Sequence, residues 1–113
     1  MKLIVAIIQP DRLNEVLDVL EKEEIHLVTV SNVLGRGRQK GISEVYRGHK
    51  EVGSLLRKVR LDIAVTDEFV QRAIAAIQKG AHSGSIGDGK IFVLDLKECI
   101  RISSGEKGEV AIG

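Results

Sequence analysis

Hydrophobic residues in the first third of the chain follow two different periods. Six consecutive apolar residues at 3–8, ended by Pro10, predict a buried strand. Apolar residues then recur at the i, i+3, i+4, i+7 spacing of an amphipathic helix: Leu13, Val16, Leu17 and Leu20. Asp11 is the candidate N-cap of this helix. Residues 25–34 are rich in β-branched side chains, which predicts a second strand.

The second half of the chain repeats this order of elements. Residues 61–65 alternate apolar and polar side chains, as a half-buried strand does, and Thr66 or Asp67 is the candidate cap of the next helix. Helical spacing then returns at Val70, Ala73, Ile74 and Ile77. The helix is expected to end at Gly80 with a left-handed cap, and a last strand is expected near 91–96. The order β-α-β-β-α-β predicts an α+β, ferredoxin-like domain.

Glycine marks the loops of this domain. All 12 glycines lie in the ranges 35–53, 80–89 and 105–113, which predicts three flexible connections. The connection over about 36–55 is longer than an ordinary loop of a compact domain, so it is expected to carry function. Five cations and two acids occur in it, and its partner is therefore expected to be anionic or lined by carbonyl groups.

Composition narrows the class of protein. A chain of 113 residues with 43% hydrophobic residues is expected to form one globular domain. A net charge of +1 and three aromatic residues argue against nucleic-acid binding. The longest apolar run is too short for a membrane span, no secretion signal is recognised, and there is a single cysteine, Cys99. These features predict a cytoplasmic location.

The segment Gly87-Asp88-Gly89-Lys90 is the main candidate for chemistry. Its backbone N–H groups could form an anion nest beside the lysine charge, and the alternative is a glycine-rich hairpin turn with an exposed lysine. It is not a P-loop, because Lys90 is followed by Ile91 rather than by serine or threonine. No nucleophile with a base and oxyanion donors is recognisable, and the histidines lack metal-ligand spacing. A binding protein is therefore expected rather than an enzyme, and slow ATP hydrolysis would be incidental.

Three segments together resemble the PII nitrogen-regulatory signalling proteins: GRGRQKG at 35–41, YRG at 46–48 and SGSIGDGKIF at 83–92. The similarity covers the whole chain, so it implies one PII-type domain over 1–113. Its loops would be a T-loop at about 36–55, a B-loop at about 82–90 and a C-terminal loop at about 102–109. The resemblance also implies a homotrimer that senses ATP or ADP in the clefts between its subunits.

The resemblance assigns nucleotide contacts to Ile7, Thr29, Gly35, Gly37, Arg38, Gln39, Ala64, Gly87, Asp88, Gly89, Lys90 and Arg101. The phosphates would rest on 87–90 and Arg38, with Arg101 reaching in from the neighbouring subunit. The adenine would lie near Ile7, Gly35, Ala64 and the neighbour's Thr29.

An effector site is implied as well, since the family binds 2-oxoglutarate once ATP and Mg²⁺ are bound. The matching residues are Gln39, Lys40, Gly41, Lys58, Ile86 and Gly87. The side-chain oxygen of Gln39 would contribute to the Mg²⁺ site, and Lys58 would pair with a carboxylate.

The T-loop would dock onto nitrogen-metabolism targets through Tyr46 and Arg47. In family members that block ammonium transporters, the arginine after the loop tyrosine enters the channel mouth, so an ammonium transporter is an expected partner. Such docking would give the cytoplasmic protein a reversible membrane association.

Three positions depart from the family pattern. Glu51 stands where many members carry the uridylylated tyrosine, His49 stands where others carry a phosphorylated serine, and Ser103 replaces a second C-terminal arginine. The last change removes one phosphate contact, with Arg36 or Lys107 as candidates to compensate. It favours an alternative function, a PII-like sensor of another small ligand such as bicarbonate or a different adenine nucleotide.

Overall fold

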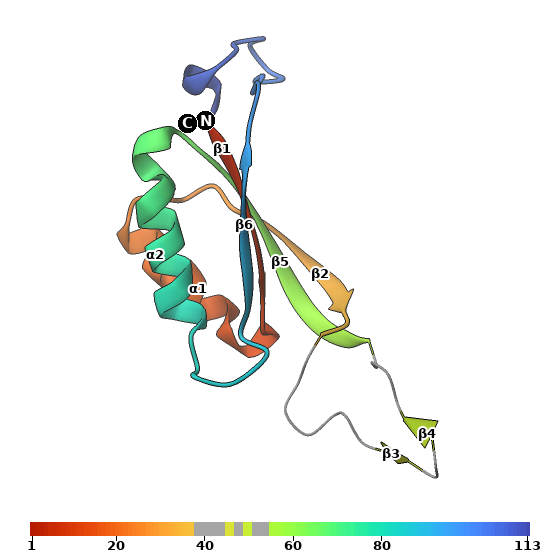
Figure 1. Cartoon of the computed structure of the whole chain (residues 1–113). Coiled ribbons are helices and arrows are strands. Elements are labelled where there is room, and N and C mark those ends of the chain that lie inside the picture. Colours follow the sequence, from red (N-terminus) through yellow and green to blue (C-terminus); the bar gives the residue numbers. More distant parts are fainter. Residues whose placement is uncertain (38–44, 47–48, 51–54) are drawn as a thin grey trace.

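A four-stranded antiparallel sheet with two helices on one face forms the body of the molecule (Figure 1). The computed structural model describes residues 1–37, 45–46, 49–50 and 55–113. The sheet strands are β1 (Lys2–Ile8), β2 (Thr29–Gly35), β5 (Leu56–Val65) and β6 (Gly89–Asp95), in the order β2-β5-β1-β6. The helices are α1 (Leu13–Lys22) and α2 (Val70–Ala81), and β3 (Val45–Tyr46) pairs with β4 (His49–Lys50). The predicted α+β, ferredoxin-like arrangement is confirmed.

The core lies between the helices and one face of the sheet. Alternate residues of β1 and β5 are buried there: Ile4, Ala6, Ile8, Val59, Leu61, Ile63 and Val65. The helices contribute the residues that the 3.6-residue period predicted, among them Val16, Leu20, Ala73 and Ile77. The hydrophobic pattern therefore identified the buried faces of α1, α2 and the second half of β5.

The predicted helix caps are wrong. Each helix is entered through a 3₁₀ turn, η1 (Pro10–Arg12) before α1 and η2 (Asp67–Phe69) before α2, and neither N-cap makes a side-chain hydrogen bond. The turns are closed by the backbone instead, since Arg12 N–H donates to the Gln9 carbonyl and Phe69 N–H donates to the Thr66 carbonyl, both at 3.0 Å. The carboxylate of Asp67 accepts a hydrogen bond from the N-terminal ammonium group at 2.9 Å.

Several strand boundaries also differ from those predicted. β2 begins at Thr29 rather than at residue 25, because Glu24 has a φ of 63° and Ile25 N–H still donates to the Leu20 carbonyl, 2.9 Å away. β5 begins five residues earlier than predicted, at Leu56, and β6 begins at Gly89 instead of residue 91. Gly89 and Lys90 of the expected B-loop therefore belong to a strand.

Gly80 does not cap α2 in a left-handed conformation. It lies inside the helix, which continues to Ala81, and it is not among the residues with positive φ. A Cβ on Gly80 would lie 2.6 Å from Val16 Cα and 2.8 Å from Val16 N. Glycine is required here because the backbones of α1 and α2 approach each other closely.

The sheet face opposite the helices is apolar on the side of β1 and β6. Register partners share a face, so Leu3 and Leu94, and likewise Val5 and Phe92, lie on the face that the helices leave open. Phe92 is 49% exposed and Leu94 is 46% exposed. β2 and β6 are the two edges of the four-stranded sheet, so each has one side without a strand neighbour in that sheet. A single chain therefore leaves apolar side chains and strand edges uncovered.

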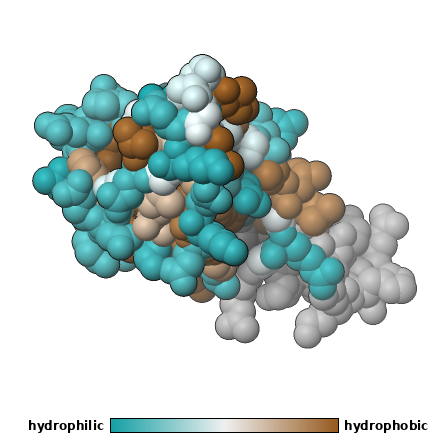
Figure 2. Space-filling view, turned by 90° about the horizontal axis from the view of Figure 1, so that it is seen from above, coloured by the Kyte–Doolittle hydropathy of each residue, from teal (hydrophilic) through white to brown (hydrophobic). Residues whose placement is uncertain are grey.

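Further hydrophobic side chains are exposed at the end of the molecule where both termini lie (Figure 1). Figure 2 views the molecule from this end and shows brown side chains scattered among hydrophilic ones. Exposed apolar residues of the C-terminal segment include Ile100, Ile102 and Val110. No helix in the described part of the chain has the length and apolar character needed to cross a membrane.

Replacing Gly80 by alanine is expected to lower the free energy of unfolding by about 1–3 kcal/mol, because the added methyl group would force α1 and α2 apart. Urea denaturation followed by circular dichroism measures this change. Gly37→Ala is the matched control, since no atom of the described residues lies within 4 Å of its added Cβ. Equal stability of the two variants would contradict the helix-packing role of Gly80.

Candidate functional site

The start of β6 lies unusually close to the end of β1. Gly89 pairs with Ile8, and a Cβ on Gly89 would lie 1.8 Å from the Ile7 carbonyl oxygen. Gly89 also has a φ of 116°, a backbone conformation that residues with a side chain rarely adopt. Lys90 is the register partner of Ile7, so these two predicted nucleotide contacts lie on the same face of the sheet. The position of Gly89 determines where the preceding loop leaves the sheet.

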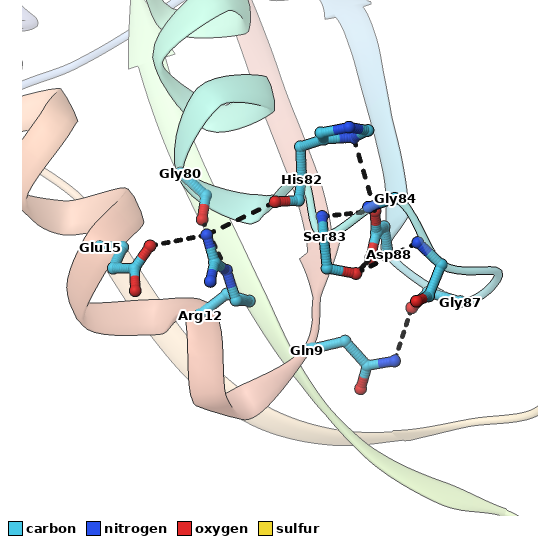
Figure 3. A network of polar contacts seen from close by, with 10 residues as sticks. Gln9, Arg12, Glu15, Gly80, His82, Ser83, Gly84, Gly87 and Asp88 are labelled. Carbon is cyan, nitrogen blue, oxygen red and sulfur yellow. Dashed lines mark hydrogen bonds and ion pairs between the residues drawn. The ribbon is translucent and has the colours of Figure 1, made fainter.

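The loop before β6 is organised by the Asp88 carboxylate (Figure 3). Asp88 accepts hydrogen bonds from Ser83 N–H at 2.8 Å, from Gly84 N–H at 3.2 Å and from the Ser83 hydroxyl. His82 Nδ1 lies 3.6 Å from the same carboxylate. These hydrogen bonds, above all that from the Ser83 hydroxyl, hold the pKa of Asp88 below its usual value. The carboxylate of Asp88 thus shapes the loop from within.

Two side chains from other elements converge on the carbonyl of Gly87. Gln9 Nε2 donates to it at 2.6 Å, and Lys58 Nζ donates to it at 3.5 Å. Lys58 is only 8% exposed, and its Cγ would lie 3.2 Å from a Cβ on Gly35. In the described part of the chain, Lys58 has no carboxylate within ion-pair distance. A buried ammonium group next to a glycine-rich loop can bind an anion at low desolvation cost.

A groove of about 450 Å³ adjoins this loop. Its lining includes apolar residues of α2 and β6, such as Ile74, Ile77 and Val93. It also includes Ile7 and residues 88–90 at the end of the loop. The site thus combines apolar surface with backbone N–H groups and a lysine, as many small-molecule sites do.

The predicted site residues fall into two groups within one chain. Ile7, Gly35, Lys58, Ile86 and the 87–90 segment lie at the end of the sheet that carries the loop. Ala64 lies toward the opposite end, since it pairs with Leu3, and Thr29 lies across β5 from β1, since it pairs with Asp62. Leu3 is four residues from Ile7, or about 13 Å along β1. One chain does not bring Ala64 and Thr29 to the Ile7 site.

Arg101 also lies outside the loop site and is bound by its own C-terminal segment. Its guanidinium group pairs with Glu106 at 3.0 Å and donates to the carbonyl oxygens of Val110 at 2.9 Å and Gly113 at 2.6 Å. In this arrangement three partners hold the side chain within the segment 101–113.

The remaining predicted residues lie largely outside the described residues. These are Arg38, Gln39, Lys40, Gly41 and Arg47; of Tyr46 the structure describes the backbone, in β3. Gly37 is described and lies two residues beyond the end of β2.

Sequence reasoning missed two residues that contact the loop, Gln9 and Arg12. Arg12 Nε donates to the Gly80 carbonyl at 2.9 Å, Arg12 Nη2 lies 3.5 Å from the His82 carbonyl oxygen, and Glu15 pairs with Arg12 at 2.6 Å. Both residues come from the turn after β1, and the sequence of this turn matches no recognisable motif. Their role depends on contacts with residues about 70 positions further along the chain, so no local signal could have identified them.

Comparison with known proteins gives consistent results over the whole chain. The family model described as "Nitrogen regulatory protein P-II" matches residues 1–106. The nitrogen regulatory protein P-II of Azospirillum brasilense is 50% identical over 112 residues, which cover 99% of this chain and 100% of that protein. The nitrogen regulatory protein P-II 2 of Methanothermobacter thermautotrophicus is 48% identical, covering 99% of this chain and 97% of that protein.

A solved structure agrees with these sequence matches. The crystal structure of Arabidopsis thaliana PII bound to citrate superposes with a TM-score of 0.79 at 36% sequence identity. The match covers 98% of this chain and 88% of that one.

Proposed function

The chain belongs to the nitrogen regulatory protein P-II family, and from this premise we propose that it is a non-enzymatic sensor of ATP or ADP and 2-oxoglutarate. The nucleotide would bind at the 87–90 segment, with Mg²⁺ held through Gln39 and the nucleotide phosphates. The bound ligands would determine the conformation of the long loop at about 36–55, and this loop would dock onto a nitrogen-metabolism target. Family members are named as regulatory proteins, which supports a signalling role rather than a catalytic one.

The single observation that carries this proposal is Lys58 beside Gly87. The ammonium group is buried, and in the described residues its hydrogen-bond partner is one carbonyl oxygen at 3.5 Å. Such a group gains most from a charged acceptor, because Coulomb attraction between opposite charges is added to the hydrogen bond. A dicarboxylate such as 2-oxoglutarate supplies that acceptor. The citrate bound by the Arabidopsis PII is also a carboxylate ligand, which supports the same chemistry at this fold.

The separation of the site residues supports a homo-oligomer. Ile7, Lys90 and the loop lie at one end of the sheet, whereas Ala64 lies about 13 Å away along the strand direction and Thr29 lies on the far side of β5 from β1. A second copy that presents its own Thr29 and Ala64 to the Ile7 end of the first would complete the set. Such a contact is heterologous, because two different surfaces of the same chain meet. Repeated around a rotation axis, it would form a closed ring. The family resemblance specifies three copies, so we propose a homotrimer with Ala64 and Thr29 both contributed by the neighbour.

Light scattering tests the trimer directly. The protein is expected to have three times the chain mass of 12.3 kDa. Phe92→Asp is expected to lower that mass toward the monomer, because it places a charge on the open apolar face. Lys79→Glu on the exposed side of α2 is the control and is expected to remain trimeric. A wild-type protein that is monomeric at micromolar concentration would contradict the assembly.

Calorimetry tests the sensor. In the wild-type protein, 2-oxoglutarate is expected to tighten ATP·Mg²⁺ binding at least fivefold, and ATP is expected to tighten 2-oxoglutarate binding by the same factor, since coupling is reciprocal. Lys58→Met keeps the aliphatic stem and removes the buried charge, so this coupling is expected to be lost. Arg57→Met removes the adjacent exposed charge and is the matched control. Equal coupling in both variants would rule out Lys58 as the carboxylate partner.

The same titration separates the proposed function from its alternative. Ser103 removes one cation from the C-terminal segment, which favours a sensor tuned to bicarbonate or to another adenine nucleotide. Tight nucleotide binding that does not respond to 2-oxoglutarate would support this alternative.

We propose an ammonium transporter as the target, with Arg47 as the residue that enters the channel mouth. Arg47→Ala is expected to abolish co-sedimentation with transporter-containing membranes and to leave ATP affinity unchanged. Lys50→Ala removes another cation of the same loop and serves as the control. Retained co-sedimentation of the Arg47 variant, or its loss of ATP binding, would contradict this docking role.

A further inference from the structure

The turn between β1 and α1 contacts both ends of the loop that precedes β6 (Figure 3). Arg12 donates to the carbonyl of Gly80 at 2.9 Å, where α2 ends and the loop begins. Gln9 donates to the carbonyl of Gly87 at 2.6 Å, where the loop ends. One short segment therefore holds the loop from two points.

The contact at Gly87 determines the orientation of the peptide group between Gly87 and Asp88. All peptide bonds of the described chain are trans, and in a trans peptide the carbonyl and the following N–H point in opposite directions. Because the Gly87 carbonyl points to Gln9, the N–H of Asp88 points away from Gln9. Gly87 has a φ of 101° and no side chain to hinder rotation, so its own conformation does not prevent this peptide from flipping.

Asp88 can offer an anion its main-chain N–H and little else. Its carboxylate already accepts hydrogen bonds from Ser83 and Gly84. Asp88 follows the turn at residues 86–87, and its N–H has no backbone carbonyl acceptor of good geometry among the described residues. The direction of this one donor is therefore decisive for a phosphate that rests on the loop.

Lys58 does not replace Gln9 in this role. Its Nζ is 3.5 Å from the Gly87 carbonyl, compared with 2.6 Å for Gln9 Nε2. An anionic ligand would also attract the ammonium group away from the carbonyl, since a charged acceptor binds it more strongly. Gln9 would then be the remaining donor to Gly87.

We propose that Gln9 is a positioning residue for phosphate binding: its amide fixes the Gly87–Asp88 peptide so that the Asp88 N–H points toward the ligand. This inference rests on the proposed nucleotide site. Gln9 itself touches the Gly87 carbonyl, and its effect on the phosphate is transmitted through the peptide group.

The test compares Gln9→Met with Gln71→Met. Methionine keeps the approximate size of glutamine and cannot donate, and Gln71 is an exposed residue on α2 that undergoes the same chemical change. Affinities for ATP and for adenosine are measured by calorimetry, and thermal stability is recorded for each variant. Gln9→Met is expected to bind ATP about three- to tenfold more weakly, the range of one hydrogen bond, and to bind adenosine as the wild type does.

A loss that is confined to the phosphate-bearing ligand distinguishes positioning from general destabilisation. Equal weakening of ATP and adenosine, or unchanged ATP affinity in Gln9→Met, would overturn the inference while the nucleotide site itself stands. A wild-type protein that binds no ATP would overturn the proposed function and this inference together. In the ligand-free protein, the amide ¹H–¹⁵N resonance of Asp88 is expected to shift in Gln9→Met and to stay in place in Gln71→Met.

Discussion

The close contact between Gly89 and β1 is the constraint on which the site depends. A Cβ at this position would lie 1.8 Å from the Ile7 carbonyl oxygen, so β6 can pair with β1 in this register only when residue 89 is glycine. The register places Lys90 opposite Ile7 and makes the preceding loop leave the sheet beside Gln9 and Lys58. The hydrogen bonds of Asp88 to Ser83 and Gly84 then give that loop its shape. The candidate anion site is thus a consequence of one strand pairing.

Because the helices cover only one face of the sheet, the other face and both sheet edges are open to a partner. Two helices bury one face, while the other keeps Phe92 and Leu94 about half exposed and leaves β2 and β6 as sheet edges. The site residues that a single chain keeps apart lie at separate places on this same sheet. The proposed assembly would therefore both cover apolar surface and complete the proposed nucleotide site.

Individual residues show where sequence reasoning succeeded and where it failed. The continuous apolar run at 3–8 identified β1, in which the adjacent residues Ile4, Val5 and Ala6 are all buried. The helical spacing from Leu13 identified α1, because burial of one helix face imposes a 3.6-residue period. Gly80 was misread as a helix end, since a glycine required by helix contact and a glycine required by a turn look alike in sequence. Asp11, Thr66 and Asp67 suggested side-chain caps, but backbone hydrogen bonds close the turns that lead into both helices.

The amino-acid sequence by itself determined the element order, the fold class and the family resemblance, and it named most of the residues for which a site is proposed. These depend on local period and on motifs such as the 83–92 segment, which are written in neighbouring residues. Only the tertiary structure decided that Lys58 is buried against Gly87, that Ala64 and Thr29 lie away from Ile7, and that Gln9 holds the loop. The physical reason is that these relations join residues up to 78 positions apart. Such pairs are brought into contact by strand register and helix packing, which no local pattern encodes.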